Sequence, residues 1–175
     1  MEGMKLFHTC PVNDAELLVV MLEKHEIDAK EEMIEPIRIS AKALPEQQPR
    51  YFMGLGDPAG LVEAIACGVD MFDCVWPTRL ATHGTALTLK GRVNLGAARY
   101  AKSDDAIDPD FALSPASRWS RGYIRHLLSV GEPVAARLLT LHNLAWIIDF
   151  MKRARASIVQ GAFDNFRKET LQIWG

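Results

Sequence analysis

The sequence predicts an α/β protein in two parts, a small N-terminal β-α-β unit and a longer second part that ends in helices. Three observations lead to this prediction. Strand-like apolar runs alternate with capped helical segments in residues 4–36 and again in residues 51–75. Apolar residues alternate about Lys90-Gly91, as in a β-hairpin, and from about residue 119 they recur at helical spacing. Because strands that alternate with helices form parallel sheets, we expect an α/β architecture.

The first part is expected to cover residues 1–38. Residues 4–10 are strand-like, residues 15–27 fit a helix capped by Asn13 or Asp14, and residues 28–36 fit a weaker second strand. This pattern resembles the small ferredoxin-like signal-transducing modules of bacteria, without any chemical motif. The polar, proline-bearing residues 39–50 predict a linker before a second domain at 51–175.

The second part opens with a predicted strand-helix-strand unit. Residues 51–54 form a short strand, Asp57 is a helix N-cap, and Gly68 closes the helix. The following apolar run, residues 69–75, is typical of a short buried strand, and Pro77 ends it because proline has no amide proton to donate.

The remaining elements are a hairpin and helices. Leu87, Leu89, Val93 and Leu95 alternate as the two arms of a hairpin. A helix follows with Trp119, Tyr123, His126 and Leu127 on one face, and two more are expected at about residues 134–160 and 165–173.

Composition limits the class of protein. In 175 residues, 49% are apolar, enough for a core in one domain or two small ones. The absence of a run of about 18 apolar residues predicts no membrane span, and the N-terminus has no long apolar segment typical of a signal peptide. The three cysteines, Cys10, Cys67 and Cys74, show no CxxC spacing. We therefore expect a cytoplasmic protein without a disulfide framework or a cysteine zinc site.

The net charge of −2 is unevenly distributed. Residues 1–50 carry 6 basic and 10 acidic side chains, whereas eight basic residues lie between Arg79 and Arg125. This segment is compatible with a phosphate-facing patch, although on charge alone a solvated surface is the simpler interpretation.

Asp73 is the first candidate for chemistry. It stands at the end of a predicted parallel strand, where active-site residues of α/β folds gather. Most acidic residues beside a strand face water or cap a turn, so from these residues alone a structural role for Asp73 is the simpler interpretation, for instance capping the loop through Thr78.

The motif around Asp73 carries a family resemblance. The segment YFMGLGDPAGLVEAIACGVDMFDCVWPTR is similar to the signature of the tRNA-guanine transglycosylases, the queuine and archaeosine family. The similarity continues through GRVNLGAARY, the IDP segment, RWSRGYIRHL and LTLHNLAWI, from about residue 49 to 166. The family fold implies that this chain holds a partial (β/α)₈-barrel-type fragment with a β-hairpin and C-terminal helices.

The resemblance implies residue roles. The aspartate of FDCV, here Asp73, would be the nucleophile that attacks the ribose C1′ of a guanosine in tRNA and expels guanine. Met53 would pack on the flipped base beside Gly54, and Arg79 would lie near the RNA backbone. Three further residues match an aromatic cluster that forms the family's homodimer contact: Trp119, Tyr123 and His126. An ordinary helix core face explains those three equally well.

The family's zinc site is not reproduced in this sequence. The three cysteine positions of its CxCxxC motif hold Phe111, Leu113 and Ala116, and only the histidine, His142, remains. One histidine cannot build a tetrahedral zinc site. We therefore predict no metal and no other cofactor, an apolar cluster in place of the cysteines, and a core role for His142.

Two functions remain open from the sequence. The chain is too short for a complete barrel, which needs about 200–250 residues, and the family's base-reading carboxylates are not found in residues 1–48. It could be the catalytic piece of a pentosyltransferase whose remaining barrel comes from a second protomer or a transglycosylase partner chain. Alternatively, it is a non-catalytic binding or regulatory module. The expected partners are tRNA and one of these chains, with no membrane.

Overall fold

The computed structural model describes residues 4–12, 15–22 and 30–175, with side chains described from residue 34 onward. The chain divides into two compact units, one up to Cys74 and one covering Val75–Trp174. The division at Cys74 falls in a different place from the predicted linker, residues 39–50, and the first part of that predicted linker is helical.

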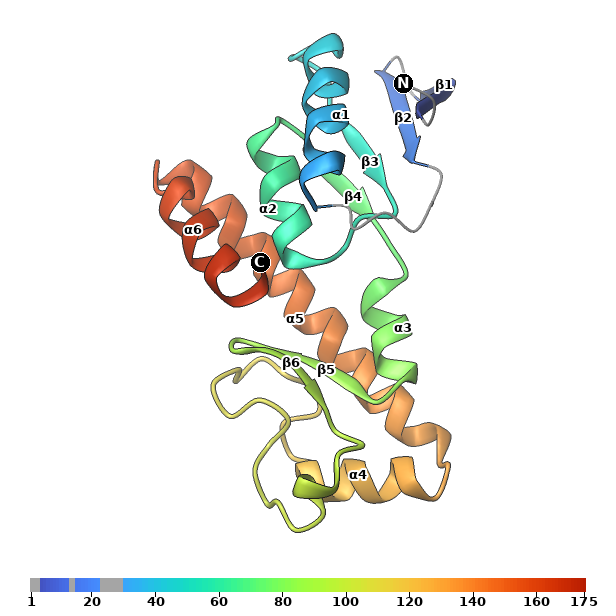
Figure 1. Ribbon diagram of the computed structural model, residues 1–175, viewed down its shortest axis with the longest axis vertical. Helices are drawn as coiled ribbons and strands as arrows, with labels where there is room; N and C mark the ends of the chain where they lie inside the picture. The colour runs from blue at the N-terminus through green and yellow to red at the C-terminus, as the bar shows by residue number, and fades with distance from the viewer. Residues whose placement is uncertain (1–3, 13–14, 23–29) are drawn as a thin grey trace. The chain divides into compact units, whose positions relative to one another are not determined.

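The first unit contains a sheet in the order β1-β2-β3-β4, shown in Figure 1 from blue to green. Strand β1 pairs antiparallel with β2, and the β2-β3 and β3-β4 pairs are parallel. Its elements are β1 (Met4–Val12), β2 (Ala15–Leu22), α1 (Lys30–Ala43), β3 (Tyr51–Met53), α2 (Pro58–Ala66) and β4 (Met71–Asp73). The α/β class predicted from the sequence is confirmed.

The predicted helix over residues 15–27 is wrong, because Ala15–Leu22 is strand β2. The six consecutive apolar residues from Leu17 to Leu22 fit a strand buried on both faces as well as a helix, and periodicity alone cannot separate the two. Pairing decides the outcome, since β2 hydrogen-bonds to β1 on one side and to β3 on the other. Residues 4–10 lie within β1, so the first predicted strand is confirmed.

The predicted strand over residues 28–36 is also wrong, because Lys30–Ala43 forms helix α1. Lysine and glutamate at its start favour a helix. Ile37 and Ala41, four residues apart and therefore on one face, are each 2% exposed. The N-terminal order is therefore β-β-α, which differs from the predicted β-α-β unit.

The predicted β3-α2-β4 crossover is confirmed. The Asp57 carboxylate accepts the Gly60 N–H at 2.9 Å as a helix N-cap, and Pro58 follows at the start of the helix. Gly68 ends the turn after the helix with φ +95°, a conformation that glycine adopts without strain. Helix α2 buries Leu61 and Val62. The crossover delivers Asp73 to the carboxyl end of β4.

Strand β4 is more exposed than the sequence predicted. Met71 is 43% exposed, Phe72 is half-buried and Asp73 is exposed. The physical reason is that β4 pairs only with β3 among the described strands, so it stands at the edge of the sheet. On the other side of β3, strand β2 pairs with Tyr51 and Phe52.

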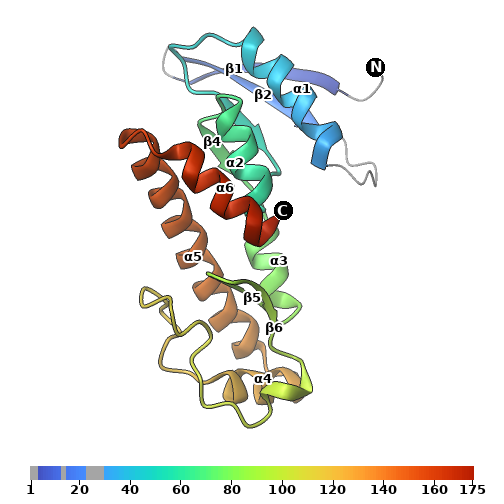
Figure 2. The same ribbon diagram turned by 60° about the vertical axis from the view of Figure 1, so that its left-hand side comes forward.

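The second unit is built around the long helix α5. Its elements are α3 (Trp76–Thr82), β5 (Thr85–Thr88), β6 (Gly91–Asn94), the short 3₁₀ helix η1 (Ala98–Tyr100), α4 (Arg121–Ser129), α5 (Pro133–Val159) and α6 (Phe163–Trp174). A core cluster joins α3, β5, α4, α5 and the segments between them through Ala81, Ala86, Leu95, Ile107, Ala116, Ile124 and Leu139. Figure 2 shows α6 returning along α5. The hairpin and the helices predicted near residues 119–127, 134–160 and 165–173 are confirmed.

Helix α5 is long and apolar enough, by length and composition alone, to cross a membrane, which the count of apolar residues did not predict. About 33% of that window is buried within the structure. Its buried residues include the polar pair His142 and Asn143, and both bond to β5. These contacts are those of a helix packed within a folded unit.

Candidate functional site

Asp73 is held by a tyrosine that the motif analysis did not single out. The Tyr51 hydroxyl, on β3, donates a hydrogen bond to Asp73 Oδ1 at 2.6 Å. Tyr51 and Asp73 lie two register positions apart on paired strands, since Tyr51 faces Met71 and Met53 faces Asp73. Tyrosine at the first position of YFMG was visible in the sequence, but its contact with Asp73 follows only from the β3-β4 register.

The electrostatics of this pair fix the direction of the hydrogen bond. The hydrogen bond to Asp73 raises the pKa of Tyr51 to about 12, with smaller contributions from burial and from the Asp73 charge. A tyrosine phenol is protonated at neutral pH in any case, and the raised pKa extends that range, so Tyr51 is the donor. With Oδ1 occupied in this way, the second carboxylate oxygen of the exposed Asp73 is oriented for other contacts.

Gly54, directly after β3, has open space around its Cα. Its N–H donates to the Asp73 carbonyl at 2.8 Å, and its φ is +81°. A Cβ placed on Gly54 would meet no heavy atom within 4 Å. A planar group can therefore approach the backbone here. The structure brings together three of the predicted site residues, Met53, Gly54 and Asp73, at the ends of β3 and β4.

Asp70 and Asp73 have different surroundings although both flank the same strand. Asp70 Oδ2 accepts the backbone N–H of Arg50 at 2.9 Å, so Asp70 fixes the loop before β3. The Thr78 hydroxyl donates to the Val75 carbonyl at 2.9 Å, so its hydrogen bond does not go to Asp73. Of the two aspartates, Asp70 is the one with a backbone-capping contact.

Arg79 lies on α3, in the second unit, with an exposed side chain. Its proximity to an RNA backbone stays a prediction.

Trp119, Tyr123 and His126 lie at the start of α4 and along it. The Trp119 and Tyr123 rings stack with centroids 5.0 Å apart, and the Arg118 guanidinium lies 4.5 Å from the Trp119 centroid. Tyr123 is 41% exposed and His126 is exposed. The interpretation of these side chains as a core face is therefore wrong for Tyr123 and His126. The buried face of α4 carries Ile124 and Leu127 instead.

The residues at the zinc-ligand positions do not form a metal site. Phe111 is 4% exposed and Ala116 is fully buried, which fits the predicted apolar cluster, but Leu113 is 66% exposed and lies outside it. Among the described residues, no group of three or more His, Cys, Asp or Glu side chains is placed to hold a metal ion. The donor set therefore does not fit zinc, which takes four nitrogen, sulfur or oxygen ligands.

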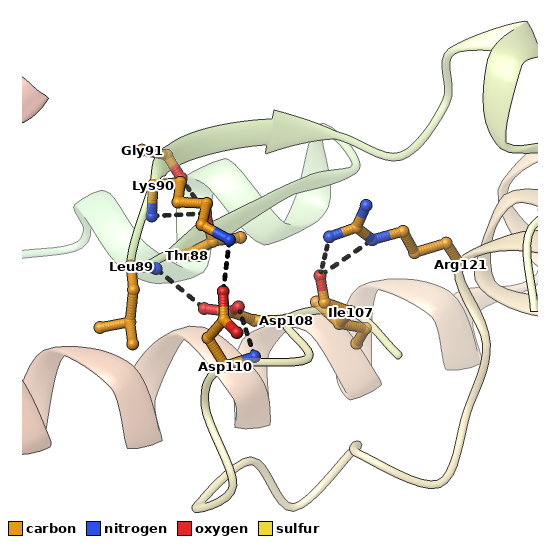
Figure 3. Close-up of polar contacts among 8 residues, drawn as sticks. All are labelled: Thr88, Leu89, Lys90, Gly91, Ile107, Asp108, Asp110 and Arg121. Atoms are coloured by element: carbon orange, nitrogen blue, oxygen red, sulfur yellow. Dashed lines mark hydrogen bonds and ion pairs between the residues drawn. The ribbon is translucent and has the colours of Figure 1, made fainter. Parts of the chain in front are cut away.

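The IDP segment is fixed by hydrogen bonds (Figure 3). Asp108 is 5% exposed, and its carboxylate accepts the N–H groups of Leu89 at 2.8 Å and Asp110 at 3.2 Å. The Arg121 guanidinium donates to the Ile107 carbonyl at 3.0 and 3.1 Å. The bond from Leu89 joins this segment to the β5-β6 turn, and the bonds from Arg121 join it to α4. Asp108 therefore has a structural role in the second unit.

Comparison with known proteins gives a consistent result. A model of the queuine tRNA-ribosyltransferase family matches residues 20–175. The chain belongs to the queuine tRNA-ribosyltransferase family. It is 43% identical to the queuine tRNA-ribosyltransferase of Herpetosiphon aurantiacus over 144 residues, 82% of this chain and 37% of that protein. It is also 43% identical to those of Thermotoga neapolitana, over 81% of this chain and 38% of that protein, and Brucella melitensis, over 84% and 39%.

The extent of these matches matters for the site. Queuine tRNA-ribosyltransferases from these three organisms share sequence with most of this chain, but the chain spans less than two fifths of their length. The family match includes Met53, Gly54, Asp73 and Arg79.

Proposed function

We propose that this protein takes part in base exchange at guanine in tRNA, with Asp73 as the nucleophile. The single observation that carries the proposal is the geometry of Asp73. Its exposed carboxylate stands at the carboxyl end of a parallel strand and is held at one oxygen by Tyr51. Its backbone carbonyl accepts the N–H of Gly54, which has open space around it. Membership of the queuine tRNA-ribosyltransferase family supplies the reaction class.

The proposed chemistry is a double displacement. A free Asp73 oxygen attacks C1′ of the target ribose, the glycosidic bond breaks, and guanine leaves with the bonding electrons and takes up a proton. The ribose is then held as an ester of Asp73. A ring nitrogen of the incoming deazaguanine base attacks C1′, loses its proton, and restores the carboxylate. Splitting one displacement into two steps is the usual benefit of a covalent nucleophile.

The other site residues have positioning roles in this proposal. The flipped base lies against the open backbone at Gly54, with Met53 packing on it. Tyr51 orients the carboxylate, because its hydroxyl occupies Oδ1. Arg79 contributes a cation toward the RNA phosphates.

We propose further that the chain works with a second chain. It spans 37% to 39% of the length of the three relatives, and β4 offers an edge without a partner among the described strands. A transglycosylase partner chain would supply the remaining pocket. The exposed Tyr123 and His126, with Trp119, are the surface for contact with a second protomer.

A non-catalytic binding module derived from the family is the second candidate. The exposure of β4 favours it, because a nucleophile without surrounding walls has little positioning power.

Incorporation of labelled guanine into unmodified tRNA separates the two candidates. The chain is assayed alone, with cell extract, and with the N-terminal part of a family member as the complementing chain. We expect the chain to raise incorporation above that of the extract or the complementing chain alone. Asp73→Ala should not give this increase. Asp104→Ala is the matched control, because Asp104 is an exposed aspartate in the second unit, outside β3 and β4. Equal increments in wild type and Asp73→Ala, or none with a folded protein, contradict catalysis by Asp73.

A further inference from the structure

His142 makes two hydrogen bonds in the interior of the second unit. It lies on α5 and is 0% exposed. Its Nε2 is 2.7 Å from the Leu87 carbonyl oxygen, and its Nδ1 is 2.8 Å from Ser114 Oγ. The Phe111 ring stands edge-on to the imidazole, with centroids 5.8 Å apart.

The proton positions follow from the chemistry of the partners. A carbonyl oxygen only accepts, so Nε2 carries a proton and donates to Leu87. Burial lowers the pKa of His142, which favours the neutral ring, and Nδ1 then accepts the Ser114 hydroxyl proton. Ser114 Oγ in turn accepts the Ala116 N–H at 3.2 Å. We name this chain of donors, from Ala116 through Ser114 and His142 to Leu87, the His142 relay.

We infer that the His142 relay takes the place of a metal in this chain and fastens residues 111–116 to α5 and β5 without one. A site built on these positions and His142 would join the segment to α5, and the relay joins it to α5 and, through Leu87, to β5 as well. Both ring nitrogens are already engaged, so His142 has no lone pair to offer a cation. Breaking the relay would leave a buried carbonyl or hydroxyl without a partner, which is costly in a low-dielectric interior.

Neighbouring contacts support a metal-free attachment of the segment. Just before it, Asp108 accepts the Leu89 N–H at 2.8 Å and Arg121 donates to the Ile107 carbonyl. Inside it, Phe111 and Ala116 are buried apolar side chains, and neither can bind a metal ion. The second unit therefore obtains from hydrogen bonds and apolar packing what a bound ion would supply.

The first experiment measures metal content and thermal unfolding of the full chain purified from zinc-supplemented culture. We expect no stoichiometric zinc by elemental analysis, and the same Tm with and without a chelator. One zinc per chain, or a lower Tm in the chelator, would overturn the inference.

A second experiment tests the relay itself. Nitrogen NMR at neutral pH should show His142 neutral and protonated at Nε2. Ser114→Ala should shift the Nδ1 resonance and lower Tm by about 2–6 °C, because Nδ1 loses its donor. Ser117→Ala is the matched control, since Ser117 is exposed, and should leave both unchanged. A ring protonated at Nδ1, or identical His142 spectra in wild type and Ser114→Ala, would refute the relay.

Discussion

Asp73 and His142 both stand at positions of family motifs, but their surroundings are opposite. Asp73 is exposed at a sheet edge, and one hydrogen bond from Tyr51 orients it. His142 is fully buried, and both of its nitrogens are satisfied. An exposed carboxylate with an oxygen available is suited to chemistry, whereas a saturated buried imidazole is suited to fixing a fold. The comparison therefore separates a motif residue that we propose to react from one that is held by hydrogen bonds in the interior.

The largest expected effect concerns Asp73. Asp73→Asn keeps the size and the Tyr51 contact but removes the anionic nucleophile. In a complemented assay we expect guanine exchange to fall by at least ~10³-fold, as for loss of other covalent nucleophiles. The rate of label incorporation into tRNA is the measurement, with Asp104→Asn, at an exposed position of the second unit, expected to stay near wild type. A variant that keeps most of its activity would remove Asp73 from the reaction.

The next effect concerns the buried side of the comparison. Asn143 is fully buried, accepts the Leu87 N–H at 2.9 Å, and donates to the Pro77 and Thr85 carbonyls at 3.0 Å. Asn143→Ala leaves these groups unpaired, so we expect a loss of about 2–4 kcal/mol in the free energy of unfolding in urea. Asn165→Ala, at an exposed position of α6, should change it by less than about 0.5 kcal/mol. Similar losses in both variants would show that Asn143 does not tie α5 to β5.

A smaller effect is expected for Tyr51→Phe, at the residue that contacts the exposed Asp73 carboxylate. It removes the hydroxyl that orients Asp73 and leaves the ring in place. We expect exchange to fall by about 3- to 10-fold while binding of tRNA stays the same, because only orientation of the carboxylate is lost. Tyr100→Phe in the second unit serves as control. An unchanged turnover would mean that Asp73 needs no orientation by Tyr51.

The smallest effect is a pH dependence of stability from His142. Burial lowers its folded pKa below the unfolded value of 6.5, and Asp108 is the charged group that opposes the shift. As the pH falls, His142 therefore takes up a proton in the unfolded state before it does so in the folded state. His142 leaves the free energy of unfolding unchanged above about pH 6.5 and lowers it as the pH falls further. The free energy of unfolding, measured in urea at several pH values from 7.5 to 5, should fall less steeply with falling pH in His142→Gln than in wild type. An equal pH dependence in the two proteins would show that another group is responsible for it.

Local signals in the sequence predicted much of this fold. Asp57 with Pro58 marked the start of α2, and Gly68 marked its end, because caps and positive φ depend on residues close in sequence. The apolar run Leu17–Leu22 did not reveal β2, since only its pairing with β3 separates strand from helix.

Site residues that lie within a recognisable sequence motif could be predicted. Asp73, Met53 and Gly54 were identified in this way. Tyr51, Ser114 and Asn143 were not, because their partners lie 22, 28 and 56 or more residues away. Such contacts depend on strand register and helix packing, which one sequence without its fold does not contain. Leu113 illustrates the same limit, since its 66% exposure contradicts the apolar cluster that its residue type suggested.

The central claim is that Asp73 still forms a bond to ribose, and intact-mass analysis tests it most directly. The chain is incubated with guanine-containing tRNA and its complementing chain, quenched, treated with nuclease, and weighed. The account predicts a mass increase equal to a ribonucleotide fragment lacking guanine, mapped to Asp73 and missing from Asp73→Ala. A folded, complemented wild type without this adduct, or an adduct that persists in Asp73→Ala, would contradict it.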